Sequence, residues 1–141
     1  MDVRVGGRRL VGMSMQTPGG EMRMWFTGEH LEVVANRRLV YTESVCDEAG
    51  NLIAPSDMGM PQGQPLTTTV TVELREVAGR TTMVLTHAGI AAGSPGAAGW
   101  QMALGKLAVY LEGLSPQLAL SLTRPTAADA TPSRTRVKRA S

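Results

Sequence analysis

The 141-residue sequence has few of the residues that build disulfide scaffolds, metal cages or membrane spans. Its single cysteine, Cys46, cannot form an intrachain disulfide and has no second thiol for a Cys-x-x-Cys pair. The two histidines, His30 and His87, are not accompanied by ligands at the spacing of a zinc site. No run approaches the roughly 18 consecutive apolar residues of a membrane span, and the first residues lack the apolar core of a signal peptide. The sequence therefore predicts a cytoplasmic protein with no metal, no cofactor and no disulfide.

Charge is also scarce, and it is unevenly placed. Charged residues make up 18% of the chain, and the net charge is only +2. The segment 123–141 holds five basic residues, one acidic residue, two prolines and a single large apolar residue, Val137. This composition is typical of a solvated chain end. We expect one domain over 1–122 and a disordered basic tail over 123–141. Because no aromatic residue lies among the bases, specific nucleic-acid binding is not expected.

Alternating apolar residues and closely spaced turns predict an antiparallel meander in the first half of the chain. The predicted strands cover 8–16, 21–34 and 39–46, and they are separated by glycine-rich or asparagine-containing turns. Gly28 lies inside the second of these strands, where a bulge is expected. The following segment, 47–66, contains three prolines and three glycines without a sustained period, which predicts a long loop.

A hairpin is predicted from 68–76 and 80–87, with its turn at 77–79. Only some registers keep the apolar residues of both strands on one face, and a slip by one residue would pair them with threonines. Those registers place Val70, Val72 and Leu74 opposite Met83 and Leu85. In the same registers His87 points to the apolar face, so it is the titratable group that we expect inside.

The hydrophobic period changes after Gly99 from that of a strand to that of a helix. Apolar residues recur there at intervals of three and four, which predicts an amphipathic helix ending near Gly113, before Pro116. The predicted inner stripe consists of Trp100, Ala103, Leu104, Leu107, Ala108, Leu111 and Leu114. Strands followed by one long helix indicate an α+β fold, in which a curved antiparallel sheet of about six strands grips the C-terminal helix.

Several stretches together resemble the START-like (SRPBCC) helix-grip superfamily, and within it the family of homologues of the activator of the ninety-kilodalton heat-shock protein ATPase. The matching stretches are 2–7, 28–34, 38–42, 70–74, 82–89, and Gly99-Trp100 with the leucines of the helix. Members of this family begin with a strand and two short helices ahead of the segment resembling 2–7. The resemblance therefore implies an N-terminally truncated domain, through a misassigned start or a shortened copy.

The resemblance implies a hydrophobic cavity between the sheet and the C-terminal helix. We expect this cavity to bind a hydrophobic small molecule without catalysis. Its predicted lining is Val72, Leu74, Met83, Leu85, His87, Trp100, Leu104, Leu107 and Leu111.

Two other functions stay open at this point. The family name implies a co-chaperone-like module, with a role in the stress response, that stimulates a heat-shock protein ATPase by contact. A cyclase or hydrolase would instead use polar groups of the cavity, for which His87 and Tyr41 are the candidate acid and base. A chaperone or a second copy of the chain is therefore a possible partner besides a small molecule.

Overall fold

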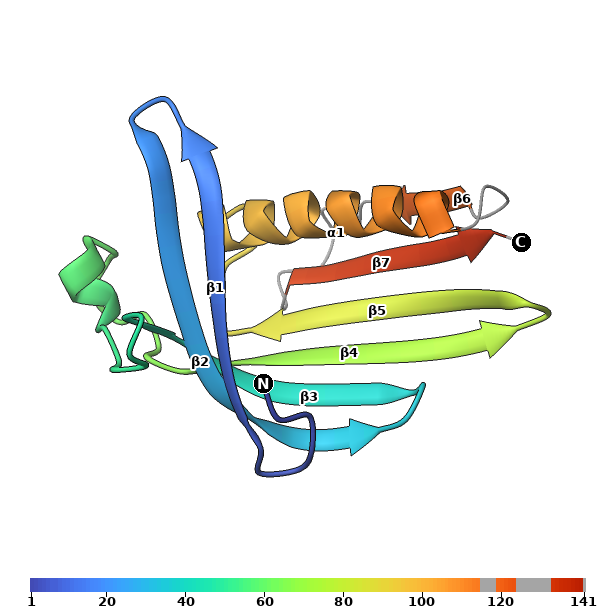
Figure 1. Ribbon diagram of the computed structural model, residues 1–141, viewed down its shortest axis with the longest axis horizontal. Coiled ribbons are helices and arrows are strands. Elements are labelled where there is room, and N and C mark those ends of the chain that lie inside the picture. The colour runs from blue at the N-terminus through green and yellow to red at the C-terminus, as the bar shows by residue number, and fades with distance from the viewer. Residues whose placement is uncertain (115–118, 124–132, 141) are drawn as a thin grey trace. The chain divides into compact units, whose positions relative to one another are not determined.

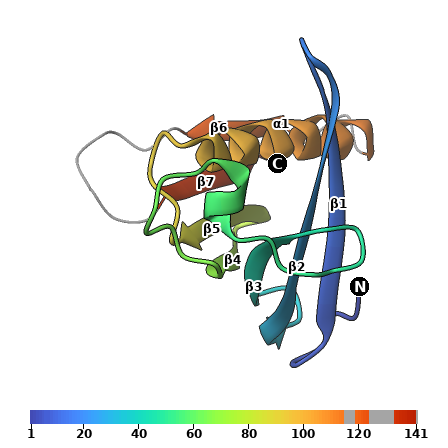
Figure 2. The same ribbon diagram turned by 90° about the vertical axis from the view of Figure 1, so that its left-hand side faces the viewer.

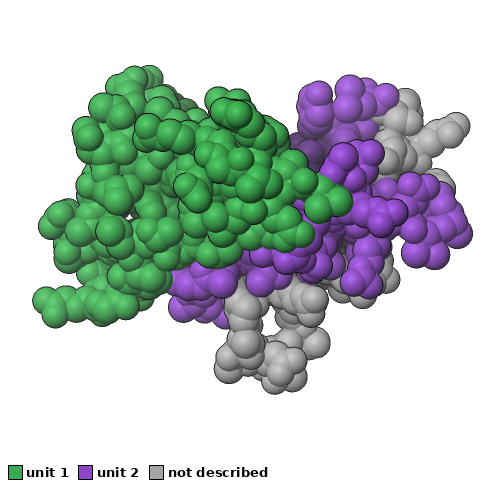
Figure 3. Space-filling model, turned by 90° about the horizontal axis from the view of Figure 1, so that it is seen from below, with its two compact units in different colours: residues 1–34, 39–70 green, residues 35–38, 71–141 purple. Residues whose placement is uncertain are grey.

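The computed structural model describes residues 1–114, 119–123 and 133–140. Two compact units make up the chain: residues 1–34 with 39–70 form the first, and residues 35–38 with 71–141 form the second (Figure 3). The element order is five strands, one long helix and two further strands, with a short 3-10 helix between the third and fourth strands (Figure 1). This order confirms the predicted α+β class, with an antiparallel sheet and a C-terminal helix.

The first unit begins with a long antiparallel hairpin. Strand β1 (Arg8–Thr17) pairs with β2 (Gly20–Val34) in a register that runs from Arg8↔Glu29 to Thr17↔Gly20. Strand β3 (Arg38–Cys46) follows β2 in the sheet order, and the start of β4 (Thr68–Val77) follows β3. The buried side chains of this unit include Val40, Val70 and the polar His30.

Gly28 does not form the predicted bulge in the β1–β2 pair. The register passes through Arg9↔Gly28 without an extra residue on either strand. The glycine is explained instead by β3, because a Cβ atom at this position would collide with the backbone carbonyl of Thr42. Close approach of two backbones is a common reason for glycine inside a strand.

The predicted loop 47–66 is largely irregular. It contains an isolated bridge between Cys46 and Leu52 and the short 3-10 helix η1 (Pro55–Met58), whose residues are all at least partly exposed. Asp47 closes the first turn of the loop, since its carboxylate accepts hydrogen bonds from the backbone and side-chain nitrogens of Asn51, both at 2.8 Å. These bonds hold the pKa of Asp47 below its usual range.

The second unit contains the rest of β4, strand β5 (Arg80–Ala88) and helix α1 (Pro95–Leu114). The turn between β4 and β5 has Ala78 and Gly79 at φ +52° and +74°, which is the left-handed pair of a tight hairpin turn. Strand β5 is followed in the sheet by β7 (Ser133–Ala140) and then β6 (Ala119–Thr123). Helix α1 contacts β6, and the two lie side by side in both ribbon views (Figure 1 and Figure 2).

Helix α1 starts five residues before the predicted stripe. The hydroxyl of Ser94 accepts a hydrogen bond from the Ala97 backbone N–H at 3.3 Å, and Pro95 occupies the first helical position. A serine cap followed by proline is a favoured helix start. This cap begins the helix ahead of the glycines at 96 and 99. No helix within the described residues is long and apolar enough to cross a membrane.

The inner face of α1 differs in part from the predicted stripe. Leu104 is buried, and Trp100, Ala108 and Leu111 are half-buried. Ala103, Leu107 and Leu114 are exposed instead, together with Met102, Val109 and Tyr110. The helix therefore has apolar residues on both its inner and outer faces, and periodicity alone could not distinguish them.

The basic end of the chain includes a strand. Ser133–Ala140 forms β7, which pairs antiparallel with β5 from Thr82↔Lys138 to His87↔Ser133. Thr123, the first residue of the expected disordered tail, is the last residue of β6, and 124–132 and 141 lie outside the described residues. A domain end at residue 122 stays a prediction. The side of β5 away from β4 has backbone donors and acceptors. A later segment of the chain can form hydrogen bonds with them whatever its charge.

Candidate functional site

The residues predicted to line the ligand cavity all belong to the second unit. On the two strands, Leu85 and His87 are buried, while Val72, Leu74 and Met83 are half-buried. On α1, Leu104 is buried and Trp100 and Leu111 are half-buried, whereas Leu107 is 37% exposed. Residues at every second position of a strand share one face, so Met83, Leu85 and His87 lie on the same side of β5.

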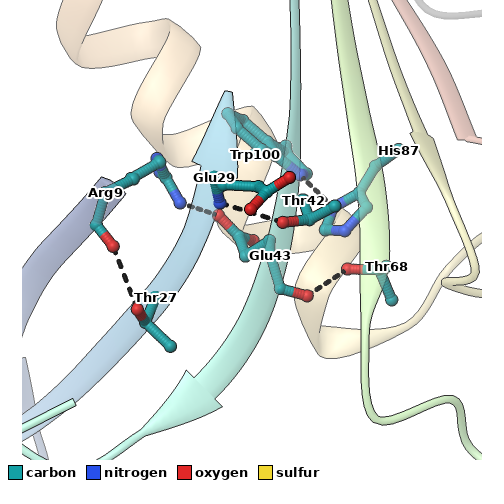
Figure 4. A network of polar contacts seen from close by, with 8 residues as sticks. All are labelled: Arg9, Thr27, Glu29, Thr42, Glu43, Thr68, His87 and Trp100. Atoms are coloured by element: carbon teal, nitrogen blue, oxygen red, sulfur yellow. Dashed lines mark hydrogen bonds and ion pairs between the residues drawn. The ribbon is translucent and has the colours of Figure 1, made fainter. Parts of the chain in front are cut away.

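His87 and Trp100 connect β5 with α1. The indole Nε1–H of Trp100 donates a hydrogen bond of 2.8 Å to His87 Nδ1, and the two rings meet edge to face with centroids 5.9 Å apart (Figure 4). This contact places His87 on the helix-facing side of β5. The expectation that His87 points inward with the apolar residues is consistent with this placement.

The Trp100 hydrogen bond defines the protonation pattern of the His87 ring. Indole nitrogen can only donate, so His87 Nδ1 must accept and cannot carry a proton while the bond exists. A neutral imidazole then carries its proton on Nε2. The arrangement presents His87 as an oriented N–H donor rather than as a base whose Nδ1 lone pair is available.

Tyr41, the other candidate for acid–base chemistry, belongs to the first unit. Its ring lies under the guanidinium of Arg9, with Arg9 Cζ 4.2 Å from the ring centroid. The same guanidinium forms an ion pair of 2.8 Å with Glu43, and only 12% and 13% of the two side chains are exposed. Burial raises the pKa of Tyr41 to about 12, against a smaller lowering effect of Arg9. A phenol with this pKa stays protonated at neutral pH.

His30 is fully enclosed beside Tyr41. Its ring nitrogen Nδ1 lies 3.2 Å from the carbonyl oxygen of Gly7, to which it donates, and its ring meets Tyr41 edge to face at a centroid distance of 6.2 Å. The backbone of His30 is bound to the same turn, through bonds between His30 N and Gly7 O and between Gly6 N and His30 O. His30 therefore fixes the entry of the chain into β1, which is a structural role.

Cys46 is a covered thiol. It is 2% exposed, and burial followed by the nearby negative charge of Asp47 raises its pKa. A thiol that is both covered and protonated is a poor nucleophile. Within the described residues, no group of three histidines, cysteines or carboxylates is placed to hold a metal ion.

A shallow hollow lies on the β1–β2 hairpin, away from every residue predicted for the cavity in the sequence. Its volume is about 340 Å³. It is lined by Gly12, Met13, Ser14, Glu21, Arg23 and Trp25. The Trp25 ring lies over Gly12, where a Cβ atom would approach it to 2.9 Å.

The sequence did not predict the pairing of Arg9 with Glu43 or the stacking of Arg9 on Tyr41. These residues are more than 30 positions apart, and only the register of β1, β2 and β3 brings them together. Two signals were present: Arg9 interrupts the apolar side of the first strand, and Glu43 is the only charged residue of 39–46. Neither signal identifies the partner without the register.

Antiparallel strands followed by one long helix place the chain in the helix-grip class of α+β proteins. More narrowly, the chain belongs to the family described as Activator of Hsp90 ATPase homolog 1-like protein, whose model matches residues 1–112. This confirms the resemblance found in the sequence. No curated protein and no solved structure matches the chain.

Proposed function

We propose that the chain is a non-catalytic binding module that takes up a hydrophobic small molecule against β4, β5 and α1 of the second unit. The observation that carries this proposal is a mixture of buried and half-open apolar side chains. Leu85 and Leu104 are buried, while Val72, Leu74 and Met83 keep part of their surface exposed. Apolar surface left open beside a buried apolar set is what a hydrophobic ligand covers.

The His87–Trp100 pair supplies the polar element of the proposed site. Ligand pockets usually combine an apolar lining with a few fixed polar groups that orient the ligand. Both rings are held by their mutual hydrogen bond of 2.8 Å, so neither has to be ordered when a ligand binds. Preorganisation of this kind lowers the entropic cost of binding.

Catalysis by His87 or Tyr41 is less well supported. A general base needs an available lone pair, and the Nδ1 lone pair of His87 is used by Trp100. A general acid works best with a pKa near the operating pH, whereas burial raises the pKa of Tyr41 to about 12. A cyclase or hydrolase built on these two side chains would need both to change their surroundings.

Stimulation of a heat-shock ATPase by contact is the second candidate. The family description names an activator of the Hsp90 ATPase, and that description applies to the family as a whole. The outer face of α1 favours a protein contact, because Met102, Val109, Tyr110 and Leu114 are exposed there. An increase of ATP hydrolysis by Hsp90 on addition of the chain would favour this candidate over ligand binding alone.

Filling the proposed site with a larger side chain tests the first candidate. We expect Val72→Phe to weaken binding of the apolar fluorophore anilinonaphthalene sulfonate at least several-fold, because the added ring occupies the space of the ligand. The measurement is a fluorescence titration of the native protein, with circular dichroism to verify folding.

The matched control is Val77→Phe, on the same strand. Val77 is 73% exposed, so the same substitution there adds a ring to the surface and should leave the affinity for the fluorophore unchanged. Equal affinities of the wild type and a folded Val72→Phe variant would contradict ligand binding at this site.

A further inference from the structure

Strand β1 forms an unusual sheet edge. It is the outermost strand in the sheet order, and it is ten residues long. Its residues from Leu10 to Thr17 include no charge and no proline. Proteins normally protect such edges with charged residues, prolines, bulges or short strands, because an open edge pairs with other strands. Strand β1 has none of these protections after Arg9.

One face of the β1–β2 hairpin is apolar over three successive cross-strand pairs. Residues directly opposite each other in a ladder share a face. The pairs are Val11↔Phe26, Met13↔Met24 and Met15↔Met22. Met13 and Met22 are exposed, and the other four are half-buried. This apolar face reaches the open edge and offers flexible thioethers for contact with a partner.

We propose that β1 pairs antiparallel with β1 of a second copy of the chain, about a two-fold axis at Gly12. A two-fold interface requires a patch that is complementary to itself. With Gly12 opposite the partner's Gly12, Met13 lies opposite the partner's Val11. The apolar faces of the two hairpins then lie on the same side and join into one surface.

The charges fit this register. Arg8 would lie opposite the partner's Gln16, and in the β1–β2 ladder Gln16 pairs with Glu21. The same row therefore holds Glu29, Arg8, the partner's Gln16 and the partner's Glu21. Arg9, the other base of the strand, is already paired with Glu43. No two like charges are directly opposed, which favours a second copy over a partner strand of unrelated sequence.

Gly12 also explains why the axis can lie there. The glycine has no side chain, and the Trp25 ring covers it on one face. Two glycines at the axis let the two strands approach without a clash between facing side chains. The hollow beside Trp25 would then meet its equivalent on the partner, which makes the hollow part of the interface. The proposed pairing involves the first unit, and its test does not depend on ligand binding in the second.

The test is the molecular mass in solution of the full chain, measured by sedimentation velocity across a dilution series. We expect the wild type to sediment as a dimer that dissociates on dilution, from a chain mass of 15.0 kDa. Met13→Lys should give only monomer at the same concentrations, because it places two ammonium groups across the axis. Met13→Glu should do the same with two carboxylates.

Mixing the two charged variants distinguishes a lost interface from a lost fold. Lysine on one copy then lies diagonally across the axis from glutamate on the other, within reach of these long side chains, so the mixture should regain the dimer. Val77→Lys is the matched control, since Val77 is an exposed apolar strand residue of the second unit, and this variant should dimerise as the wild type does. A monomeric wild type, or a dimer that persists in both Met13 variants, would overturn the proposal.

Discussion

At the residue scale, burial strongly raises the pKa of Tyr41. Its ring lies between the Arg9 guanidinium and the ring of His30, and only 6% of the residue is exposed. Removing a phenolate from water is unfavourable, and this cost outweighs the attraction of the nearby guanidinium. Tyr41 is therefore a sensitive probe of whether the first unit is intact.

The phenol absorbance of Tyr41 should titrate near pH 12 in the folded protein, against an ordinary value of 10.0. Because its pKa is raised by folding, Tyr41 contributes stability fully below pH 10, and this contribution is lost as the pH rises towards 12. The loss should amount to roughly 2 to 3 kcal/mol. Spectrophotometric titration and urea unfolding at a series of alkaline pH values measure the two effects.

The control is Tyr41→Phe, which lacks the buried phenol. In Tyr41→Phe the high titration step should disappear and the alkaline loss of stability should diminish. A folded wild type in which Tyr41 ionises near pH 10 would contradict the burial of Tyr41.

Single residues were predictable from the sequence only when their environment follows from alternation. His87 lies two positions from Leu85 and four from Met83, so its inward direction follows from the period of a strand. Its bond to Trp100 does not, because the distance between β5 and α1 depends on how the helix packs. The Arg9–Glu43 pair was hidden for the same reason, since cross-strand partners are set by register.

At the element scale, two glycines that each lie inside a regular element differ in the space around them. Gly28 lies in β2 against the Thr42 carbonyl, where a Cβ atom does not fit. Gly105 lies in α1, where a Cβ atom would have no neighbour within 4 Å. The first is required by backbone packing, while the second only lowers the helix propensity of its segment.

Alanine at these two positions should therefore change stability in opposite directions. We expect Gly28→Ala to lower the free energy of unfolding by about 1 to 3 kcal/mol or to prevent folding, as overpacking does. Gly105→Ala should raise it by roughly 0.5 to 1 kcal/mol, since alanine is the better helix former. Chemical denaturation of both variants beside the wild type gives the values. A stabilising Gly28→Ala would show that β2 and β3 are not as close as the structure has them.

The elements themselves were largely predictable. Five strands and one helix follow from period and turn chemistry, and their bounds differ from the predictions by a few residues, most at the start of α1. There the cap of Ser94 and Pro95 begins the helix ahead of the predicted stripe. Strand β7 could not be predicted from composition, because a basic segment becomes a strand only when a sheet edge is available to it.

At the scale of the whole molecule, the chain has two units that share strands. Strand β4 begins in the first unit, with Thr68 to Val70, and continues in the second. The turn at 35–38 belongs to the second unit although the chain on both sides of it belongs to the first. Because both units take up chain from 35–70, no single cut in the sequence separates them.

We expect the two units to unfold in one transition. Each unit contains one tryptophan, Trp25 in the first and Trp100 in the second. Fluorescence of Trp25→Phe therefore reports the second unit, and fluorescence of Trp100→Phe reports the first. In each variant the urea midpoint from fluorescence should coincide with that from circular dichroism. Midpoints that differ between the two probes would show that the units unfold separately.

The burial of Cys46 makes the chain convenient for site-specific labelling. The thiol is covered, and its raised pKa keeps it protonated at neutral pH, so maleimide reagents should leave it unmodified while the protein is folded. A second cysteine placed at an exposed position such as Val77 would then be the only reactive thiol. A fluorophore or spin label could be attached there without first replacing Cys46, and any modification of Cys46 would itself report transient opening of the first unit.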